Sequence, residues 1–223
     1  MMKDIQHKRL SLQFITHCTN KYTYLQSAEM ALAGGCKWLQ LRMKNSPIEE
    51  VRKTAIVVQQ LCKQYQSVFI LDDNVDLCAE IQADGVHLGK NDMPILQARA
   101  ILGKNYIIGS TCNQYEDILQ AQDNGADYVG LGPFRFTTTK TNLSPILGLE
   151  GYRDILQKCR QNRINIPIVA IGGILENDIS ALFNIGIDGI AVSGLILQAE
   201  NPTQQMVQLM QKVCSHVVCS GEK

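Results

Sequence analysis

The chain has 223 residues, of which 45% are hydrophobic, so it can bury a sizeable core in one or two domains. It carries 21 Lys and Arg against 21 Asp and Glu, and this zero net charge does not indicate a nucleic-acid-binding protein. No hydrophobic run approaches the roughly 20 residues of a membrane span, so we expect a cytoplasmic protein with no membrane partner.

The eight cysteines are scattered along the chain, without a CxxC pair, and most lie in apolar segments. Spacing of this kind favours buried free thiols in a reducing compartment over a disulfide framework or a zinc site.

Short hydrophobic segments alternate with longer amphipathic ones along the whole chain. The predicted strands cover residues 10–17, 37–42, 68–72, 85–88, 106–110, 127–132, 167–171 and 189–192. The predicted helices cover residues 24–33, 47–66, 75–82, 94–102, 116–124, 150–160, 176–184 and 203–213. The chain therefore contains eight strands, each followed by a helix.

Strands that are separated by helices need crossover connections, which favour parallel pairing. Eight such units in a chain of this length predict a closed (β/α)₈ barrel, a single-domain α/β TIM barrel over residues 1–223 with its core at about 10–214. A doubly wound open sheet is the alternative, but no GxGxxG pattern follows the first strand.

In such barrels the functional residues follow the carboxyl ends of the strands. Gln40, Arg42 and Lys44 alternate at the end of the second strand, which places all three on one face. Their donors suit a polyphosphate, although charged residues at a strand exit also occur without a function.

A hydroxyl-rich loop follows the sixth strand. Thr137 and Thr139 supply neutral donors there, and Lys140 supplies a compact positive charge, so the loop could hold an anion. A polar surface loop is the alternative interpretation.

Acidic residues follow the third and fourth strands. Asp73 and Asp92 are hard oxygen ligands suited to Mg²⁺, which typically takes one or two carboxylates and leaves its other positions to water and phosphate oxygens. Together with the basic residues they indicate a diphosphate ester bound through the metal. Helix capping is the alternative, because each aspartate shortly precedes a predicted helix.

The last two strands end at glycines. Gly172-Gly173 and Ser193-Gly194 stand where barrels often build a phosphate cradle from backbone N–H groups, so a second anion site for a monophosphate is predicted. Ordinary turn formation is the alternative.

Several of these segments, in this order, resemble the thiamine-phosphate synthase (thiamine-phosphate pyrophosphorylase) family. They cover residues 40–44, 84–89 with 92–94, 126–130 with 137–140, and 169–174. The resemblance runs from the first strand almost to the end of the chain.

The resemblance implies a reaction and a set of residue roles. The family joins 4-amino-2-methyl-5-hydroxymethylpyrimidine diphosphate to 4-methyl-5-(2-phosphoethyl)thiazole, or its carboxylated form, giving thiamine phosphate and pyrophosphate. By this resemblance Gln40, Arg42, Lys44 and Lys140 bind the diphosphate, Asp73 and Asp92 bind Mg²⁺, Ser110 lies near the pyrimidine, Thr137 and Thr139 contact the thiazole, and Gly173, Val192 and Ser193 hold its phosphate.

One position departs from the family, which usually has Asn-Asp where this chain has Asp72-Asp73. An ionised aspartate cannot donate a hydrogen bond to the diphosphate, so we expect Asp72 to face the metal or a bound water. His87 is expected to pack or orient rather than act as a base. A related paralogue that isomerises the carboxythiazole phosphate, and a thiamine phosphate sensor without turnover, stay open as alternatives, as does assembly into a homo-oligomer.

Overall fold

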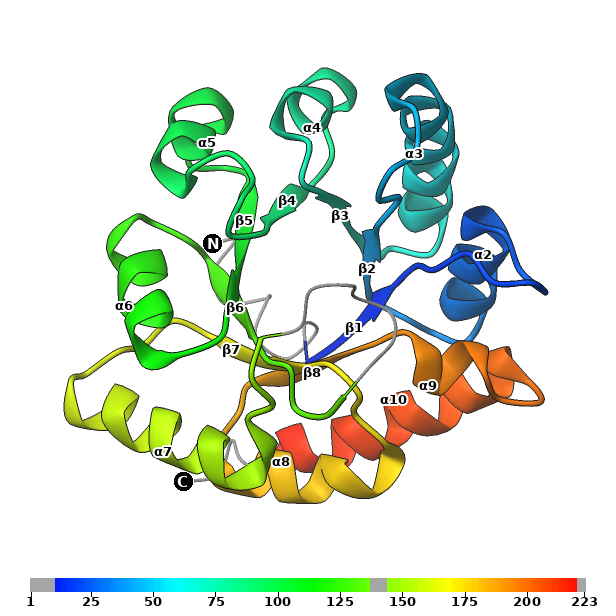
Figure 1. The fold of residues 1–223 in the computed structure, drawn as a ribbon. Helices are drawn as coiled ribbons and strands as arrows, with labels where there is room; N and C mark the ends of the chain where they lie inside the picture. Colours follow the sequence, from blue (N-terminus) through cyan, green and yellow to red (C-terminus); the bar gives the residue numbers. More distant parts are fainter. Residues whose placement is uncertain (1–10, 137–143, 220–223) are drawn as a thin grey trace.

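The computed structural model describes residues 11–136 and 144–219, with side chains up to residue 216. Eight parallel strands form a closed barrel in chain order, and β8 pairs with β1, which confirms the predicted fold. Figure 1 shows the strands as a ring surrounded by the helices. The strands are β1 Leu12–Ile15, β2 Trp38–Leu41, β3 Val68–Asp72, β4 Gly85–Leu88, β5 Ile107–Cys112, β6 Tyr128–Leu131, β7 Ile168–Ile171 and β8 Gly189–Val192.

The helices follow the predicted segments in order, and most agree in length, but the last helix continues to Cys219, six residues beyond its predicted end at residue 213. They are α2 Tyr24–Ala33, α3 Ile48–Gln64, α4 Val75–Ile81, α5 Ile95–Leu102, α6 Tyr115–Asp123, α7 Gly148–Gln161, α8 Ile179–Ile185, α9 Gly194–Leu197 and α10 Pro202–Cys219, with a 3₁₀ turn, η1, at Glu176–Asp178. The four-residue helix α9 was not predicted, and β5 continues two residues beyond its predicted end. None of the helices in residues 11–136 and 144–219 is long and apolar enough to cross a membrane.

The alternation of side chains along the strands creates two cores. One fills the barrel interior and includes Trp38, Ile70, Ile107, Tyr128 and Val169. The other lies between the sheet and the helices, as the strand sequences predict for a sheet covered on its outer face.

The barrel interior is packed tightly around Tyr128. Its ring meets Trp38 edge-on at a centroid distance of 4.7 Å. A Cβ atom at Gly109 would lie 2.2 Å from the Tyr128 ring, so the absence of a side chain at Gly109 makes room for that ring. Tyr128 therefore takes its place because a glycine stands on the neighbouring strand.

Three aspartates tie the strands together at the amino-terminal end of the barrel. Each stands directly before a strand and accepts a hydrogen bond from the backbone N–H of a residue on the preceding strand. The pairs are Asp84 with Phe69 at 2.8 Å, Asp127 with Ile108 at 2.8 Å, and Asp188 with Ile168 at 2.7 Å. These aspartates thus stabilise the barrel and lie at the end away from the predicted site.

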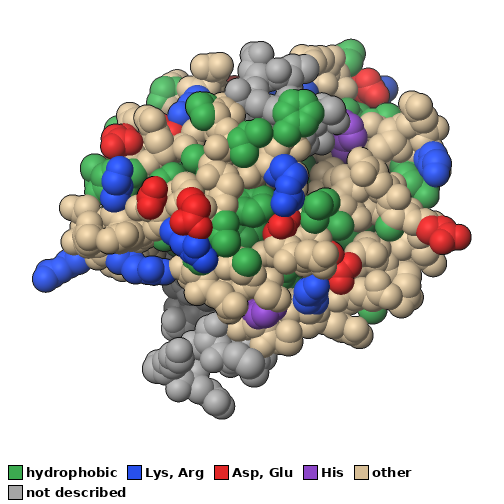
Figure 2. All heavy atoms as spheres, turned by 60° about the horizontal axis from the view of Figure 1, so that its bottom comes forward, with side chains coloured by type: hydrophobic (Ala, Val, Ile, Leu, Met, Phe, Trp, Pro, Cys, Tyr) green, Lys and Arg blue, Asp and Glu red, His purple; other side chains and the backbone are tan. Residues whose placement is uncertain are grey.

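Charged side chains of both signs are interspersed over the face that Figure 2 brings forward. Of the described cysteines, Cys36, Cys62, Cys78, Cys112 and Cys159 are buried free thiols, as predicted, and Cys18 and Cys214 are exposed free thiols.

Candidate active site

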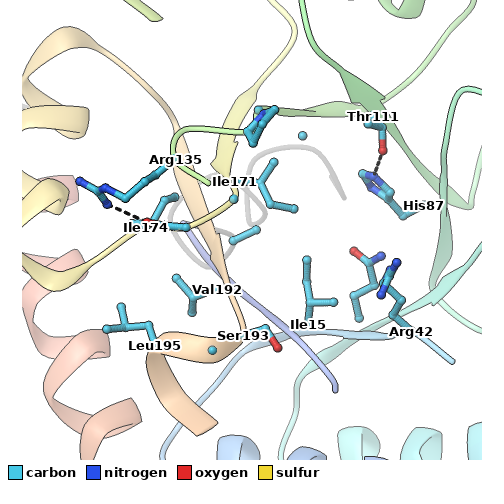
Figure 3. A pocket seen from close by; sticks show the side chains of 18 of the residues that line it. Ile15, Arg42, His87, Thr111, Arg135, Ile171, Ile174, Val192, Ser193 and Leu195 are labelled. Atoms are coloured by element: carbon cyan, nitrogen blue, oxygen red, sulfur yellow. Dashed lines mark hydrogen bonds between the residues drawn. The ribbon is translucent and has the colours of Figure 1, made fainter. Parts of the chain in front are cut away.

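A cavity of about 350 Å³ opens at the carboxyl ends of the strands. Figure 3 shows side chains from several strands and loops converging on it, with Arg42 and Ile174 on opposite sides of the view. Of the predicted site residues, it is lined by Gln40, Arg42, Lys44, Asp72, Asp73, Gly173, Val192 and Ser193. The structure thus brings together residues from the ends of β2, β3, β7 and β8.

Asp72 lies at the centre of the basic group. Its Oδ1 accepts a hydrogen bond from Gln40 Nε2 at 2.5 Å, and its Oδ2 lies 3.6 Å from Arg42 Nε and 3.7 Å from Lys44 Nζ. Burial raises the pKa of Asp72, while the charges of Lys44 and Arg42 and the bond from Gln40 oppose this rise. The carboxyl group faces its basic neighbours, and Gln40 Oε1 is buried without a hydrogen-bond partner in the described part of the chain.

Asp73 and Asp92 contact each other, although they come from different loops. Burial, the hydrogen bond with Asp92 and the charge of Asp72 raise the pKa of Asp73 to about 7. Burial also raises the pKa of Asp92, but the hydrogen bonds from Asp73 and the Gly89 N–H lower it overall. The two carboxyl groups therefore interact directly, and a divalent cation could bind both.

Neither aspartate caps a helix, which removes the alternative explanation for their positions. Asn74 caps α4 through a hydrogen bond from the Leu77 N–H, and α5 begins after Pro94 without a side-chain cap. Asp92 instead accepts a bond of 2.6 Å from the Gly89 N–H. Asp73 has a positive φ of 63°, and its carboxylate contacts the Lys44 ammonium.

The acidic pair fits a Mg²⁺ site of the kind that uses few protein ligands. Among the described residues no group of three or more His, Cys, Asp or Glu side chains could enclose a metal ion. Two carboxylates beside the basic side chains of Arg42 and Lys44 match the preference of Mg²⁺, which keeps its other positions for water and substrate oxygens.

Ser110 does not line this cavity. It lies within β5 and faces a neighbouring hollow, which Asp92 also lines, whereas the next residue, Thr111, lines the cavity itself. Side chains alternate along β5: Ile107 points into the barrel and Ile108 towards the helices, so Thr111 falls on the inner face and Ser110 on the outer one. Thr111 was not among the predicted residues because the predicted strand ended at residue 110.

His87 is held on both sides of its ring. Its Nδ1 lies 3.0 Å from the Tyr128 hydroxyl, and its Nε2 lies 3.1 Å from Thr111 Oγ1, a contact drawn in Figure 3. The side chain is only 6% exposed. These contacts suit the orienting role that was predicted for His87.

The glycine turn after β7 has the backbone conformation of an anion cradle. Gly172 and Gly173 have positive φ angles of 94° and 67°. A Cβ atom at Gly173 would lie 2.8 Å from the Phe136 carbonyl oxygen, so both conformation and space require glycine. Nearby on the cavity wall, the hydroxyl of Ser193 is buried and has no hydrogen-bond partner in the described part of the chain.

The predicted residues Thr137, Thr139 and Lys140 lie outside the described residues. Several cavity residues were not predicted, and they lie at or after the ends of four strands, β1, β5, β6 and β8. They are Ile15, Thr111, Asn113, Arg135, Phe136, Leu195 and Gln198.

The closed parallel barrel defines a (β/α)₈-barrel protein. Its mouth carries a basic and acidic group on one part and a glycine turn on another. The family model of thiamine monophosphate synthase matches residues 12–196. The chain therefore belongs to the thiamine monophosphate synthase family, whose named members are transferase enzymes, and the predicted resemblance is confirmed.

Curated relatives support this assignment over nearly their full length. The thiamine-phosphate synthase of Phocaeicola vulgatus is 54% identical over 206 residues, which cover 92% of this chain and 99% of the relative. That of Bacteroides thetaiotaomicron is 55% identical over 201 residues, which cover 90% and 96%. The solved structure of thiamine phosphate pyrophosphorylase from Pyrococcus furiosus has a TM-score of 0.79 and 35% identity, covering 93% of this chain and 98% of the other.

Proposed function

We propose that the protein is a Mg²⁺-dependent thiamine-phosphate synthase. It would join the pyrimidine diphosphate to the thiazole phosphate, or to its carboxylated form, and release pyrophosphate. The observation that carries this proposal is that one cavity holds both the basic and acidic groups of β2 and β3 and the glycine turn of β7. Two anion-binding groups in one cavity suit a reaction between two phosphorylated substrates.

The residue roles follow from the side chains at each part of the cavity. Arg42 and Lys44 supply charged donors for the diphosphate, with Gln40 beside them. Asp73 and Asp92 would hold the metal ion. The backbone of Gly173 and the unpartnered hydroxyl of Ser193 are available to the phosphate of the thiazole substrate.

The reaction we propose is a dissociative substitution at the methylene carbon of the pyrimidine. The bond between this carbon and the diphosphate oxygen breaks, and its electron pair leaves with pyrophosphate. Arg42 and Lys44 stabilise the negative charge that develops on the departing oxygens. Mg²⁺ would add positive charge at the same oxygens.

The electron-rich aminopyrimidine carries the resulting cation until the thiazole nitrogen bonds to the methylene carbon. The thiazole nitrogen is itself the nucleophile, so the step needs no nucleophilic side chain. This agrees with His87, whose ring nitrogens are both occupied by protein contacts.

The test is pyrophosphate release with both substrates, with and without Mg²⁺, beside a reaction that lacks the thiazole phosphate. We expect release only when metal and both substrates are present, with thiamine phosphate formed in equal amount. Tight product binding without turnover would instead indicate a sensor. Conversion of the carboxythiazole phosphate alone would indicate the isomerase.

A further inference from the structure

Arg135 joins the loop after β6 to the glycine turn after β7. Its Nη1 donates to the Gly173 carbonyl oxygen at 2.7 Å, and its guanidinium makes a two-pronged pair with Asp178, at 2.7 Å from Nη1 to Oδ2 and 3.0 Å from Nη2 to Oδ1. Figure 3 shows Arg135 reaching towards the turn that carries Ile174. The side chain thus connects segments 38 to 43 positions apart.

The main chain of Arg135 makes a second tie to the same turn. Its backbone N–H donates to the Gly172 carbonyl oxygen at 2.9 Å. Arg135 therefore binds two successive carbonyl groups of the turn, one through its backbone and one through its side chain.

Binding of these two carbonyls determines where the neighbouring N–H groups point. In a planar trans peptide the C=O and N–H bonds are directed oppositely. The N–H groups of Gly173 and Ile174 are consequently directed away from Arg135. Neither donates a hydrogen bond to another residue in the described part of the chain.

Gly172 and Gly173 have positive φ angles, and successive backbone N–H groups in such a turn can form an anion-binding concavity. Ile174 and Gly173 both line the cavity, so this concavity opens into the site. Asp178 also stabilises the turn itself, since its carboxylate accepts a hydrogen bond of 2.8 Å from the Leu175 N–H.

We propose that Arg135 and Asp178 are positioning residues that hold the N–H groups of Gly173 and Ile174 in place for the phosphate of the thiazole substrate. The substrate assignment rests on the proposed function, but the anion-binding geometry does not. Arg135 acts through the backbone, because three of its five guanidinium N–H donors bind Gly173 and Asp178 and hold the side chain against the turn.

Steady-state kinetics of Arg135→Met and Asp178→Asn test the positioning role. We expect the KM for the thiazole phosphate to rise about ten-fold in both variants, and the KM for the pyrimidine diphosphate to change less than two-fold. The matched control is Arg153→Met on α7, whose guanidinium pairs with Glu150 at the surface and should alter neither constant. An equal change in both KM values, or no change in either, would overturn the proposal.

A binding experiment separates this proposal from the proposed function. Inorganic phosphate is titrated into the protein while the amide NMR signals of Gly173 and Ile174 are followed. We expect both signals to shift in the unmodified protein, and half-saturation to need about ten-fold more phosphate in Asp178→Asn. Shifts without any synthase turnover would leave the positioning role intact, whereas the absence of shifts in the unmodified protein would refute it. Circular dichroism melting identifies a variant that fails to fold, in which case the other variant carries the test.

Discussion

The ammonium group of Lys44 contacts the carboxylate of Asp73, so one residue of the predicted diphosphate clamp is paired with one predicted metal ligand. A cation that binds Asp73 competes with this pair and frees Lys44 for the substrate. Metal and diphosphate binding are therefore expected to support each other through these two residues.

The variant Lys44→Met separates the role of Lys44 in metal binding from its role in diphosphate binding. Without the competing ammonium group, Mn²⁺ should bind more tightly to the substrate-free protein, whereas the KM for the pyrimidine diphosphate should rise about ten-fold or more because a charged donor is lost. Metal binding is measured by Mn²⁺ paramagnetic resonance and KM by pyrophosphate release. Lys53→Met, at an exposed position on α3, is the control. Weaker Mn²⁺ binding in Lys44→Met would contradict this account.

Asp72→Asn removes a buried negative charge and keeps an oxygen that can accept the Gln40 hydrogen bond. Because the charge of Asp72 acts on the neighbouring Asp73, a predicted metal ligand, its loss should weaken cation binding. We expect the Mg²⁺ concentration for half-maximal activity to rise about three-fold or more, with less than a two-fold change in the KM for the pyrimidine diphosphate. Asp73→Asn is the comparison, and it should raise the Mg²⁺ requirement further because a predicted ligand is lost. If Asp72→Asn changes mainly the substrate KM, then Asp72 faces the diphosphate.

Thr111 and Ser110 offer a direct comparison of neighbouring hydroxyl groups. Thr111→Val should lower kcat/KM for the pyrimidine diphosphate about ten-fold, because it removes a cavity hydroxyl that contacts His87. Ser110→Ala should stay within two-fold, because Ser110 faces the neighbouring hollow. If Ser110→Ala lowered kcat/KM more than Thr111→Val, then Ser110 would have the role near the pyrimidine that the family resemblance implied.

The ion pair between Asp178 and Arg135 should make part of the free energy of unfolding depend on pH. The hydrogen bond from Arg135 lowers the pKa of Asp178 below its usual value, with burial opposing. A lowered folded-state pKa stabilises the protein above the unfolded-state pKa of about 3.9, and this contribution is lost as the pH falls through the folded-state value.

Asp178→Asn should therefore reduce the free energy of unfolding by about 0.5–1 kcal/mol at pH 7, since the pair is partly exposed. The difference from the unmodified protein should shrink below about pH 4 and vanish in stronger acid. Urea unfolding at several pH values measures this difference in unfolding free energy. If the difference stays constant down to pH 3, then the charge of Asp178 does not cause it.

The periodicity of the sequence was sufficient to predict the barrel, because each strand is a short hydrophobic segment and each is followed by an amphipathic helix. The exceptions have local causes. The last two residues of β5, Thr111 and Cys112, follow a serine and were read as the start of a loop. The helix α9 is only four residues long, too short to show a helical period.

For the site, alternation at the end of β2 correctly placed Gln40, Arg42 and Lys44 on one cavity wall. Contacts between distant segments could not be predicted in this way. The bonds from Arg135 to Gly173 and Asp178 depend on how two loops approach each other in the closed barrel, and no local pattern encodes that distance. The left-handed backbone of Asp73 likewise gives no signal in the sequence.

The absence of a side chain at Gly109 limits which substitutions the protein can accept during evolution. Because the Tyr128 ring occupies that space and its hydroxyl also contacts His87, a larger residue at position 109 would displace a wall of the cavity as well as the barrel interior. Positions 109 and 128 are thus expected to vary only together, and a mutation at either one reaches the substrates through the packing of the core.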